Sequence, residues 1–508
     1  MNQAANANLF SRLFDTLDDP SRLAIETQDG GRITYSDLIA RAGQMANVLA
    51  ARGVKPGDRV AVQVEKSVEN LVLYLATVRA GGVYLPLNTA YTLNELDYFI
   101  SDAEPTVVVC DPSKEEGIAS LAAKVGAKVE TLDASGKGSL TEAADKADSA
   151  FATVPRTNDD LAAILYTSGT TGRSKGAMLS HDNLASNSLT LVDYWRFTKD
   201  DVLIHALPIY HTHGLFVASN VTLFARASMI FLPKLDPELI IKLMARSTVL
   251  MGVPTFYTRL LQNPHLNKET TRHMRLFVSG SAPLLADTHR EWFARTGHAV
   301  LERYGMTETN MNTSNPYDGE RVPGAVGFPL PGVSVRVADP ETGKELARDE
   351  IGMIEVKGPN VFKGYWRMPE KTKSEFRDDG FFITGDLGKI DPKGYVHIVG
   401  RGKDLVISGG FNVYPKEIES EIDAMPGVVE SAVIGVPHPD FGEGVTAVVV
   451  RHADADVTEA SVLKGLDGRL AKFKMPKRVF IVNELPRNTM SKVQKNVLRD
   501  QYKDIYTK

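Results

Sequence analysis

Short apolar runs alternate with helical stripes along the first part of the chain, and this alternation restricts the fold more than any other feature. The strand-like runs are residues 59–64, 83–87 and 106–110, and the helical stripes are residues 67–80 and 93–102. Strands that alternate with helices of this length indicate α/β layers around a mainly parallel sheet. Another helix is predicted to begin at Ser36, as its N-cap, and to end at Gly53.

Later stretches differ in texture from this alternation. Residues 112–158 have weaker periodicity and are expected to form a peripheral excursion before a strand at residues 161–165. Between about residues 325 and 400, short alternating runs are separated by turn signals such as Asp391-Pro392-Lys393-Gly394, which indicates a β-rich subdomain. Beyond residue 405 the pattern is that of a small α+β unit.

The expected fold class is therefore a multidomain α/β and α+β protein. A chain of 508 residues is too long for a single core. We expect a large N-terminal domain at residues 1–400, which contains the α/β layered subdomains and the β-rich subdomain. A hinge at residues 401–404 and a small C-terminal α+β domain at residues 405–508 complete the expected organisation.

Composition excludes several classes of protein. The net charge of −5 gives no reason to expect nucleic acid or an anionic membrane as a partner. A single cysteine, Cys110, excludes a disulfide framework, fits a reducing compartment, and is expected to be buried because it ends an apolar run. No apolar run approaches the ~20 residues of a membrane span. With neither a secretory signal nor a C-terminal address expected, a cytoplasmic location is predicted.

A loop rich in glycine and hydroxyl side chains interrupts the alternation after residues 161–165. It reads Tyr166-Thr167-Ser168-Gly169-Thr170-Thr171-Gly172-Arg173-Ser174-Lys175-Gly176. Glycines let backbone N–H groups approach an anion closely, hydroxyls donate hydrogen bonds to its oxygens, and cations offset its charge. The loop is therefore predicted to bind a polyphosphate.

This loop does not match the Walker pattern, G-x-x-x-x-G-K-[ST]. Counted from Gly169, the second glycine is replaced by Ser174, and Gly176 follows Lys175. The apolar run at residues 177–179 also predicts a strand after the loop, where a Walker loop opens a helix. A P-loop NTPase is accordingly disfavoured.

Four other islands of glycine and polar residues share the texture of the loop. They are Arg303-Tyr304-Gly305-Met306-Thr307-Glu308-Thr309; Thr384-Gly385-Asp386-Leu387; Gly400-Arg401-Gly402-Lys403-Asp404 with Ser408-Gly409-Gly410-Phe411-Asn412-Val413-Tyr414-Pro415; and Pro486-Arg487-Asn488-Thr489-Met490-Ser491-Lys492. Taken singly, each has an ordinary structural explanation, such as a turn glycine or a surface lysine. Together and in this order, from about residue 30 to 500, they resemble the adenylate-forming superfamily of acyl-CoA synthetases, luciferases and peptide-synthetase adenylation domains.

The resemblance implies that ATP and Mg²⁺ are used to form an acyl-adenylate. The implied ATP contacts are Thr167, Ser168, Gly169, Thr170, Thr171, Gly172, Lys175, Gly280, Ser281, Ala282, Pro283, Tyr304, Thr307, Asp386, Arg401 and Lys492. Both reactants are anions, so catalysis is mainly positioning and charge neutralisation. The implied catalytic residues are Lys492, which bridges the acid and the α-phosphate, Thr307 at the α-phosphate, and Glu308, which holds Mg²⁺.

The same resemblance implies that the small C-terminal domain is mobile and rotates between two half-reactions. Lys403 is the implied hinge residue, since large backbone changes concentrate in a few such positions. In one orientation Lys492 serves adenylation, and in the other Ser408-Gly409-Gly410-Phe411 closes a channel for coenzyme A. A lysine acetyltransferase and a deacetylase acting on Lys492 are also implied, because acetylation would remove the required charge.

Arg303 indicates which acid is activated. This position faces the acyl pocket in the family, and a buried guanidinium calls for a carboxylate partner. Pairing with Glu302 is disfavoured, because neighbouring residues of a strand point to opposite faces. The other implied acid-binding residues are His211, Arg259 and Ser281. The run from Leu301 to Thr309 resembles that of malonyl-CoA synthetases, so malonate and methylmalonate are the expected substrates.

Three alternatives were weighed against this interpretation. An acyl-CoA synthetase for another small or medium acid would share the ATP site and differ only in the acyl pocket. A protein that loads its own carrier domain would need a phosphopantetheine serine after residue 500, which leaves too little chain. A nucleotide-binding sensor without turnover should lack Lys492 or Glu308, and both are present.

Overall fold

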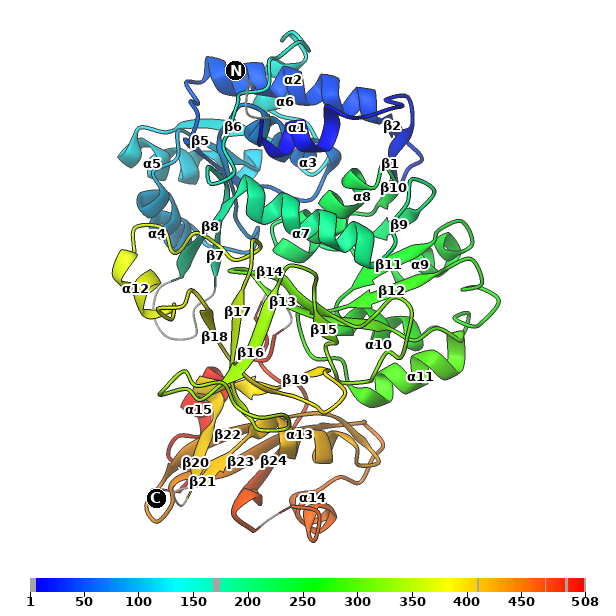
Figure 1. Ribbon diagram of the computed structural model, residues 1–508, viewed down its shortest axis with the longest axis vertical. Coiled ribbons are helices and arrows are strands. Elements are labelled where there is room, and N and C mark those ends of the chain that lie inside the picture. The colour runs from blue at the N-terminus through cyan, green and yellow to red at the C-terminus, as the bar shows by residue number, and fades with distance from the viewer. Residues whose placement is uncertain (1–5, 168–173, 409–410, 471, 489–491, 507–508) are drawn as a thin grey trace. The chain divides into compact units, whose positions relative to one another are not determined.

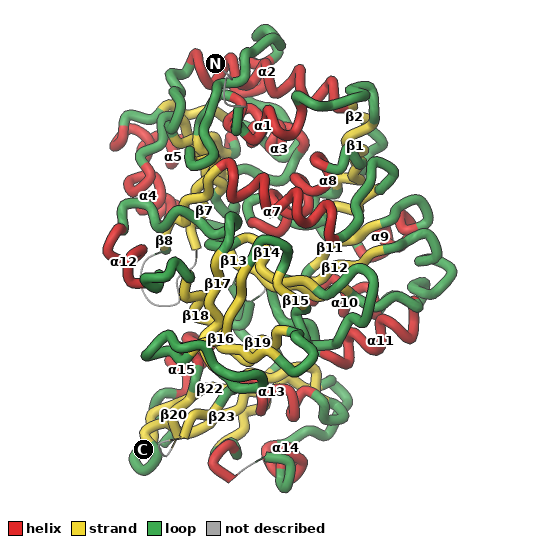
Figure 2. The backbone as a smooth tube through the Cα atoms, in the orientation of Figure 1, coloured by secondary structure: helices red, strands yellow, loops and turns green. Residues whose placement is uncertain are grey.

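The computed structural model describes residues 6–167, 174–408, 411–470, 472–488 and 492–506 (Figures 1 and 2). The chain divides into two compact units. The first contains Met1–Ser334 and Val356–Phe382, and the second contains Val335–Glu355 and Ile383–Lys508. The predicted α/β and α+β fold class is confirmed, whereas the domain bounds at residues 400 and 405 remain predictions.

A nine-stranded sheet occupies much of the first unit, in the order β15-β14-β13-β12-β11-β9-β10-β1-β2. Its strands are β1 (Leu23–Thr27), β2 (Arg32–Thr34), β9 (Val202–His205), β10 (Ser228–Phe231), β11 (Val249–Gly252), β12 (Leu276–Ser279), β13 (Leu301–Met306), β14 (Asn310–Ser314) and β15 (Phe328–Pro329). Neighbouring strands from β13 to β1 in this order are parallel, and β2, β14 and β15 are antiparallel to the strands before them in the chain.

A six-stranded sheet in the order β6-β5-β3-β4-β7-β8 forms the other layer of the first unit. Its strands are β3 (Arg59–Gln63), β4 (Val83–Pro86), β5 (Val107–Cys110), β6 (Lys128–Thr131), β7 (Leu161–Thr167) and β8 (Lys175–Ser180). The stretch expected to be a peripheral excursion supplies the edge strand β6 and therefore belongs to the sheet. Cys110 is buried as predicted, and burial raises the pKa of its thiol to about 12.

The helices of the first unit are α1 (Leu9–Phe14), α2 (Tyr35–Ala51), α3 (Val68–Arg79), α4 (Leu93–Ala103), α5 (Glu115–Val125), α6 (Ser139–Ala144), α7 (His181–Tyr194), α8 (Asn220–Phe224), α9 (Pro237–Met244), α10 (Pro254–Leu261), α11 (Ala286–Thr296) and α12 (Pro369–Ser374). The predicted N-cap of α2, Ser36, is wrong. Thr34 caps this helix, because its hydroxyl accepts from the Asp37 backbone N–H (3.1 Å) while the Asp37 carboxylate accepts from the Thr34 backbone N–H (2.8 Å).

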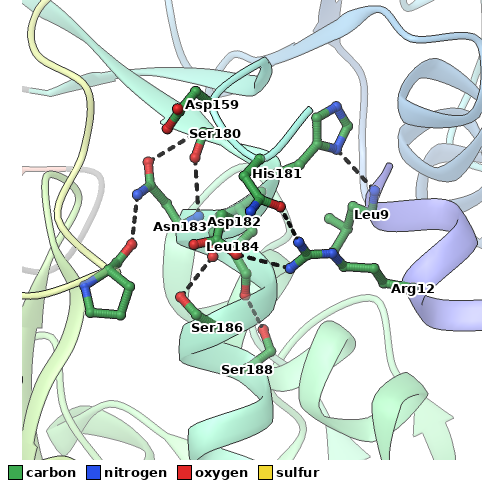
Figure 3. A network of polar contacts seen from close by, with 12 residues as sticks. Leu9, Arg12, Asp159, Ser180, His181, Asp182, Asn183, Leu184, Ser186 and Ser188 are labelled. Carbon is green, nitrogen blue, oxygen red and sulfur yellow. Dashed lines mark hydrogen bonds and ion pairs between the residues drawn. The ribbon is translucent and has the colours of Figure 1, made fainter. Parts of the chain in front are cut away.

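The start of α7 is tied to α1 by the polar network in Figure 3. The Ser180 hydroxyl caps α7 by accepting from the Asn183 backbone N–H at 3.1 Å. The buried His181 accepts from the Leu9 backbone N–H through Nδ1 at 2.9 Å, and Arg12 pairs with Asp182 at 3.0 Å. The chain that leaves the predicted phosphate loop through β8 is therefore firmly anchored at its far end.

The second unit contains two smaller sheets. One has the order β16-β17-β18-β19, with β16 (Ser334–Ala338), β17 (Gly352–Lys357), β18 (Phe382–Ile390) and β19 (Val396–Arg401). The other joins β20 (Val406–Ser408), β21 (Phe411–Val413), β22 (Val428–His438), β23 (Gly442–Arg451) and β24 (Arg478–Val482). The helices are α13 (Pro415–Asp423), α14 (Glu459–Leu466) and α15 (Lys495–Tyr502). Across the described ranges, no helix combines the length and apolar character needed to cross a bilayer.

Candidate functional site

The carboxyl ends of β9, β11, β12 and β13 meet at one edge of the nine-stranded sheet, because these strands are parallel. The order in which successive strands are added to the sheet reverses at β9, which has β10 on one side and β11 on the other. Ligands of open α/β sheets bind outside the carboxyl ends at such a switch point. His205 ends β9, Ser279 ends β12, and Arg303 lies in β13 one residue beyond Glu302, the register partner of Ser279.

Arg303 is a buried cation at this edge, and only 4% of its surface is exposed. Its Nε and Nη2 have no hydrogen-bond partner among the described residues. Burial lowers the pKa of Arg303 to about 9, and the neighbouring Tyr257 opposes this only in part. Glu302 points elsewhere, as predicted, because its carboxylate lies 3.1 Å from His289 Nδ1 and accepts from the Gly324 backbone N–H at 3.0 Å.

Gly280 makes room for the Arg303 guanidinium. A Cβ at position 280 would lie 2.4 Å from Arg303 Cζ and 2.6 Å from Nε, which no real side chain tolerates without a shift. On the neighbouring helix α10, buried Tyr257 donates from its hydroxyl to the Val278 carbonyl oxygen at 2.7 Å. The close approach at Gly280 therefore leaves room for the guanidinium that any side chain would take, and Tyr257 lies near enough to influence its charge.

Two histidines follow β9, and the second of them, His213, begins a π-helical turn at His213–Ser219. His211 is half-buried, and its Nδ1 accepts from the His213 backbone N–H at 3.4 Å. His213 is buried, and its Nδ1 lies 3.3 Å from the Ser281 hydroxyl, whereas its Nε2 has no hydrogen-bond partner among the described residues. Burial, followed by the charge of Arg303, lowers the pKa of His213 well below its usual range. His213 is therefore a neutral polar group beside the cation.

The sequence reasoning selected His211 and missed His213 and Tyr257. Arg259, another predicted acid-binding residue, lies on the exposed face of α10 and has no hydrogen bond or ion pair to any described residue. The buried positions of α10 are Phe256, Tyr257, Leu260 and Leu261. This helical stripe was readable in the sequence and would have turned Tyr257 inward and Arg259 outward.

The predicted phosphate loop connects β7 to β8, which are antiparallel and pair Thr167 with Lys175. The strand predicted after the loop is confirmed, and it separates this loop from the Walker type. Ser168, Gly169, Thr170, Thr171 and Gly172 lie outside the described residues. Lys175 Nζ lies 3.3 Å from the Glu375 carboxylate and 4.2 Å from the centre of the Tyr365 ring.

Glu308 lies in the turn between β13 and β14 and is 6% exposed. Its Oε1 accepts from the Tyr365 hydroxyl at 3.0 Å. Thr307, Tyr304, Ser281 and Ala282 are half-buried around the same strand ends, and Pro283 is exposed. Ser281 has a φ of 70°, a left-handed value that costs a non-glycine residue about 1–3 kcal/mol and is typical of functional sites.

The second unit holds the remaining predicted ATP residues. Asp386 in β18 and Arg401 in β19 are register partners, and Arg401 Nε lies 2.7 Å from the Asp386 carboxylate. Asp386 is 5% exposed. The exposed Lys492 lies in a small loop, where the Asn488 side chain accepts from its backbone N–H at 3.0 Å. Lys403 is exposed in a short 3-10 turn at the end of β19.

The predicted coenzyme A segment is described in part. Ser408 is 2% exposed and pairs with Phe411 across β20 and β21. Phe411 is 55% exposed and stacks on Phe473 with ring centres 4.7 Å apart. Gly409 and Gly410 lie outside the described residues.

Comparisons with known proteins find relatives along most of this chain. The model of the AMP-binding enzyme family matches residues 16–366, and that of the AMP-binding enzyme C-terminal domain matches residues 417–492. The crystal structure of ATP-bound MatB from Rhodopseudomonas palustris has 82% identity and a TM-score of 0.98, covering 99% of this chain and 100% of that one.

Curated relatives span most of the chain as well. A malonate–CoA ligase from Arabidopsis thaliana is 35% identical, over 92% of this chain and 82% of its own length. A feruloyl-CoA synthase from Amycolatopsis sp is 36% identical, over 93% of this chain and 94% of its own length. With these relatives and a family model across most of its length, the chain belongs to the AMP-binding enzyme family.

Proposed function

We propose that this protein is an acid–thiol ligase that joins malonate to coenzyme A and converts ATP to AMP and pyrophosphate. A carboxylate oxygen of malonate attacks the α-phosphorus of ATP, and the bond to the bridging oxygen of pyrophosphate breaks. The coenzyme A sulfur then loses its proton and attacks the acyl carbon of the malonyl-adenylate, and AMP leaves. The names of the Arabidopsis relative and of ATP-bound MatB support this reaction.

The observation that carries the proposal is the buried guanidinium of Arg303, whose Nε and Nη2 have no hydrogen-bond partner in the part of the chain that the structure describes. A buried cation without an anion is costly, and a carboxylate in contact with it would remove that cost. Malonate supplies one carboxylate for Arg303 and a second for the reaction. A monocarboxylic acid would leave the charge of Arg303 uncompensated, so the pocket selects against it.

His213, Ser281 and His211 complete the acid pocket in this proposal. When the Ser281 hydroxyl donates to His213 Nδ1, the ring hydrogen resides on Nε2, which has no partner among the described residues and is available as a donor. A neutral donor beside a cation suits an ionised carboxylate. Arg259, exposed on α10, is assigned a peripheral role at most.

The ATP site is proposed from the residues predicted in the sequence. Thr167 and Lys175, at the two ends of the loop, would hold the β- and γ-phosphates, with Tyr304 and residues 280–283 at adenine. Glu308 fits Mg²⁺, which takes one or two carboxylates and completes its shell with phosphate oxygens and water. When bound, Mg²⁺ supplies charge neutralisation to the phosphates.

The second unit is proposed to provide the remaining groups. Asp386 would accept hydrogen bonds from the ribose hydroxyls, held in place by Arg401. Lys492 would offset the repulsion between malonate and the α-phosphate, with Thr307 at the same phosphate. Ser408–Phe411 would line the coenzyme A channel, and Lys403 would serve as the hinge between the half-reactions. A cytoplasmic location and acetylation of Lys492 remain predictions.

A second candidate is the ligation of another acid, favoured by the identity to the feruloyl-CoA synthase. Methylmalonate satisfies Arg303 as malonate does, and differs by one methyl group. Ferulate brings a single carboxylate and an aromatic ring. Malonate and methylmalonate each have a second carboxylate that can pair with Arg303, whereas ferulate does not, and this difference separates the two kinds of substrate.

The test is an acid panel of malonate, methylmalonate, succinate, acetate and ferulate, each with ATP, Mg²⁺ and coenzyme A. Malonate should give AMP and thioester in equal amounts, with kcat/KM at least about 100-fold above that of acetate or ferulate. Equal efficiency with acetate or ferulate would reject the dicarboxylate assignment. Lys492→Ala should lose adenylation yet convert synthetic malonyl-adenylate to thioester, and Lys503→Ala, an exposed lysine at the end of α15, is its matched control.

A further inference from the structure

Two residues implied in ATP binding, Lys175 and Glu308, contact the same pair of side chains. The Tyr365 hydroxyl lies 3.0 Å from Glu308 Oε1 and 2.7 Å from Glu375 Oε2. The other carboxylate oxygen of Glu375 lies 3.3 Å from Lys175 Nζ, and the Lys175 ammonium lies over the Tyr365 ring at 4.2 Å. A continuous polar path therefore runs from the phosphate-loop lysine to the proposed magnesium carboxylate.

The backbone reinforces this path. The segment that carries Tyr365 forms an antiparallel bridge to β8, in which Ala177 pairs with Tyr365 two residues beyond Lys175. Three residues before Tyr365, the Phe362 backbone N–H donates to the Glu308 carbonyl oxygen at 2.7 Å. The segment thus spans from the end of the phosphate loop to the β13–β14 turn, and both functional side chains depend on its position.

The placement of Tyr365 is fixed by packing rather than by solvent. Its side chain is 2% exposed, and its ring contacts that of Phe362 at 4.8 Å between centres. Its backbone N–H donates to the hydroxyl of Thr372 in α12 at 2.9 Å, which ties the segment to this helix. A rigid phenol is suited to set the distance between two carboxylates.

The hydroxyl separates two groups of like charge. Glu308 and Glu375 both approach its oxygen, and a phenol has one proton to donate. Lys371, at 2.6 Å from the Glu375 carboxylate, and Lys175, at 3.3 Å, balance the charge on the Glu375 side. Without the hydroxyl, Glu308 Oε1 and Glu375 Oε2 would lose the group that both contact, and Glu308 would lose the hydrogen bond that holds it in place.

We propose that Tyr365, with Glu375, is a positioning residue for adenylation that holds Glu308 and Lys175 in register for the magnesium–ATP phosphates. The inference rests on the proposed function of the ATP site but not on the identity of the acid. Because the second half-reaction involves neither pyrophosphate nor its metal, that step should not depend on Tyr365.

The test compares Tyr365→Phe with Tyr35→Phe, which removes another buried hydroxyl, one that donates to the Ala227 carbonyl oxygen at 2.7 Å. Calorimetric titration with MgATP should show a Kd about 10- to 100-fold higher in Tyr365→Phe and unchanged in Tyr35→Phe. The Mg²⁺ concentration for half-maximal adenylation should also rise, while thioester formation from synthetic malonyl-adenylate stays within twofold.

Two further variants keep the inference open to refutation. In a Glu308→Gln background, Tyr365→Phe should cost less than threefold in MgATP affinity, because the hydroxyl then has no charge to position. Glu375→Gln, at a less buried position, should raise the MgATP Kd by about threefold or more. A MgATP affinity within twofold of wild type in Tyr365→Phe, or equal loss of both half-reactions, would overturn the proposal. A failed acid panel with these binding results intact would instead count only against the malonate assignment.

Discussion

Arg275 and Arg303 belong to opposite ends of neighbouring parallel strands and have opposite surroundings. Arg275 immediately precedes β12 and donates from Nε and Nη2 to the two carboxylate oxygens of Asp201, both at 2.7 Å. Burial alone would lower the pKa of Arg275, but the hydrogen bonds and charge of Asp201 outweigh it, and the net shift is upward. Arg303, in β13, has no such acid within the described ranges, and burial lowers its pKa.

The two ends of the parallel strands differ in whether their buried polar groups are paired with other groups of the protein. Asp201 and Thr248 directly precede β9 and β11, and the Thr248 hydroxyl donates to Asp201 at 2.7 Å, so the charged groups Arg275 and Asp201 at the amino ends are paired internally. At the carboxyl ends, Arg303 and His213 retain polar atoms without partners among the described residues. The pairing at the amino ends stabilises the fold, whereas the groups at the carboxyl ends are the ones that we propose bind the acid, at a cost to stability.

The largest expected effect comes from Arg303→Met. Loss of the cation should lower kcat/KM for malonate by about 10³-fold or more, since a buried carboxylate would lose its charged partner. The free energy of unfolding of the ligand-free protein should rise by about 1–3 kcal/mol, because an apolar side chain replaces an unpaired buried charge. Malonate kinetics and denaturant unfolding measure the two outcomes.

The MgATP Kd is the control for Arg303→Met and should remain within about threefold of wild type. Malonate kinetics within tenfold of wild type would sink the assignment of Arg303 to the acid. A loss of stability would show instead that this cation is paired in solution and that the contrast with Arg275 is wrong.

Arg275→Met is the next largest change and should act on stability instead of on substrate choice. It leaves the Asp201 carboxylate, 4% exposed, without its bidentate partner, and should lower the free energy of unfolding by about 3–5 kcal/mol. The ratio of malonate to acetate kcat/KM should not change. A changed ratio with normal stability would make Arg275 part of the site.

Much of the fold could be predicted from the sequence because its signals are local. The strands β3, β4, β5 and β7 lie where the sequence has apolar runs. The strand after the phosphate loop, β8, includes the apolar residues 177–179. The N-cap of α2 was missed although Asp37, three residues after Thr34, marks a capping box. The edge strand β6 was not predicted because a strand at the edge of a sheet needs only a weak apolar pattern. It is recognised as a strand by its pairing with β5.

The candidate site was predictable where a motif carried it and not where tertiary packing did. Arg303 and Glu308 lie in one short motif, so both could be named from the sequence. Nothing local marks Tyr365 as the partner of Glu308, because that contact joins residues 57 positions apart. His213 begins the π-helical turn and is buried, whereas His211 precedes it and is half-buried, and no local signal in the sequence separates the two histidines.

Gly280→Ala adds one methyl group beside Arg303 and tests how closely the guanidinium must be positioned. The new Cβ would displace the Arg303 guanidinium, because it would lie 2.4 Å from Cζ. We expect kcat/KM for malonate to fall by about 10- to 100-fold, as for other misplaced charged hydrogen bonds. In an Arg303→Met background the same substitution should cost less than threefold. Equal costs in both backgrounds would mean that Gly280 acts on ATP and not through Arg303.

The smallest expected effect concerns Asp423, a carboxyl group of the second unit that burial affects as it affects Arg303. Burial raises the pKa of Asp423 to about 6, and the negative charges of Glu419 and Glu430 act in the same direction. The hydrogen bond from Ser431 and the charge of Lys416 oppose this rise. Between pH 3.8, the ordinary pKa of an aspartic acid, and about pH 6, the folded state holds a proton that the unfolded state has lost, so this contribution to stability disappears as pH rises. Asp423→Asn should therefore be more stable than wild type, and its advantage in denaturant unfolding should grow by about 1 kcal/mol from pH 5 to pH 8. Asp500→Asn, at an exposed position of α15, should gain nothing over the same range. If the advantage of Asp423→Asn were constant with pH, Asp423 would be compensated like Arg275 and the parallel with Arg303 would fail.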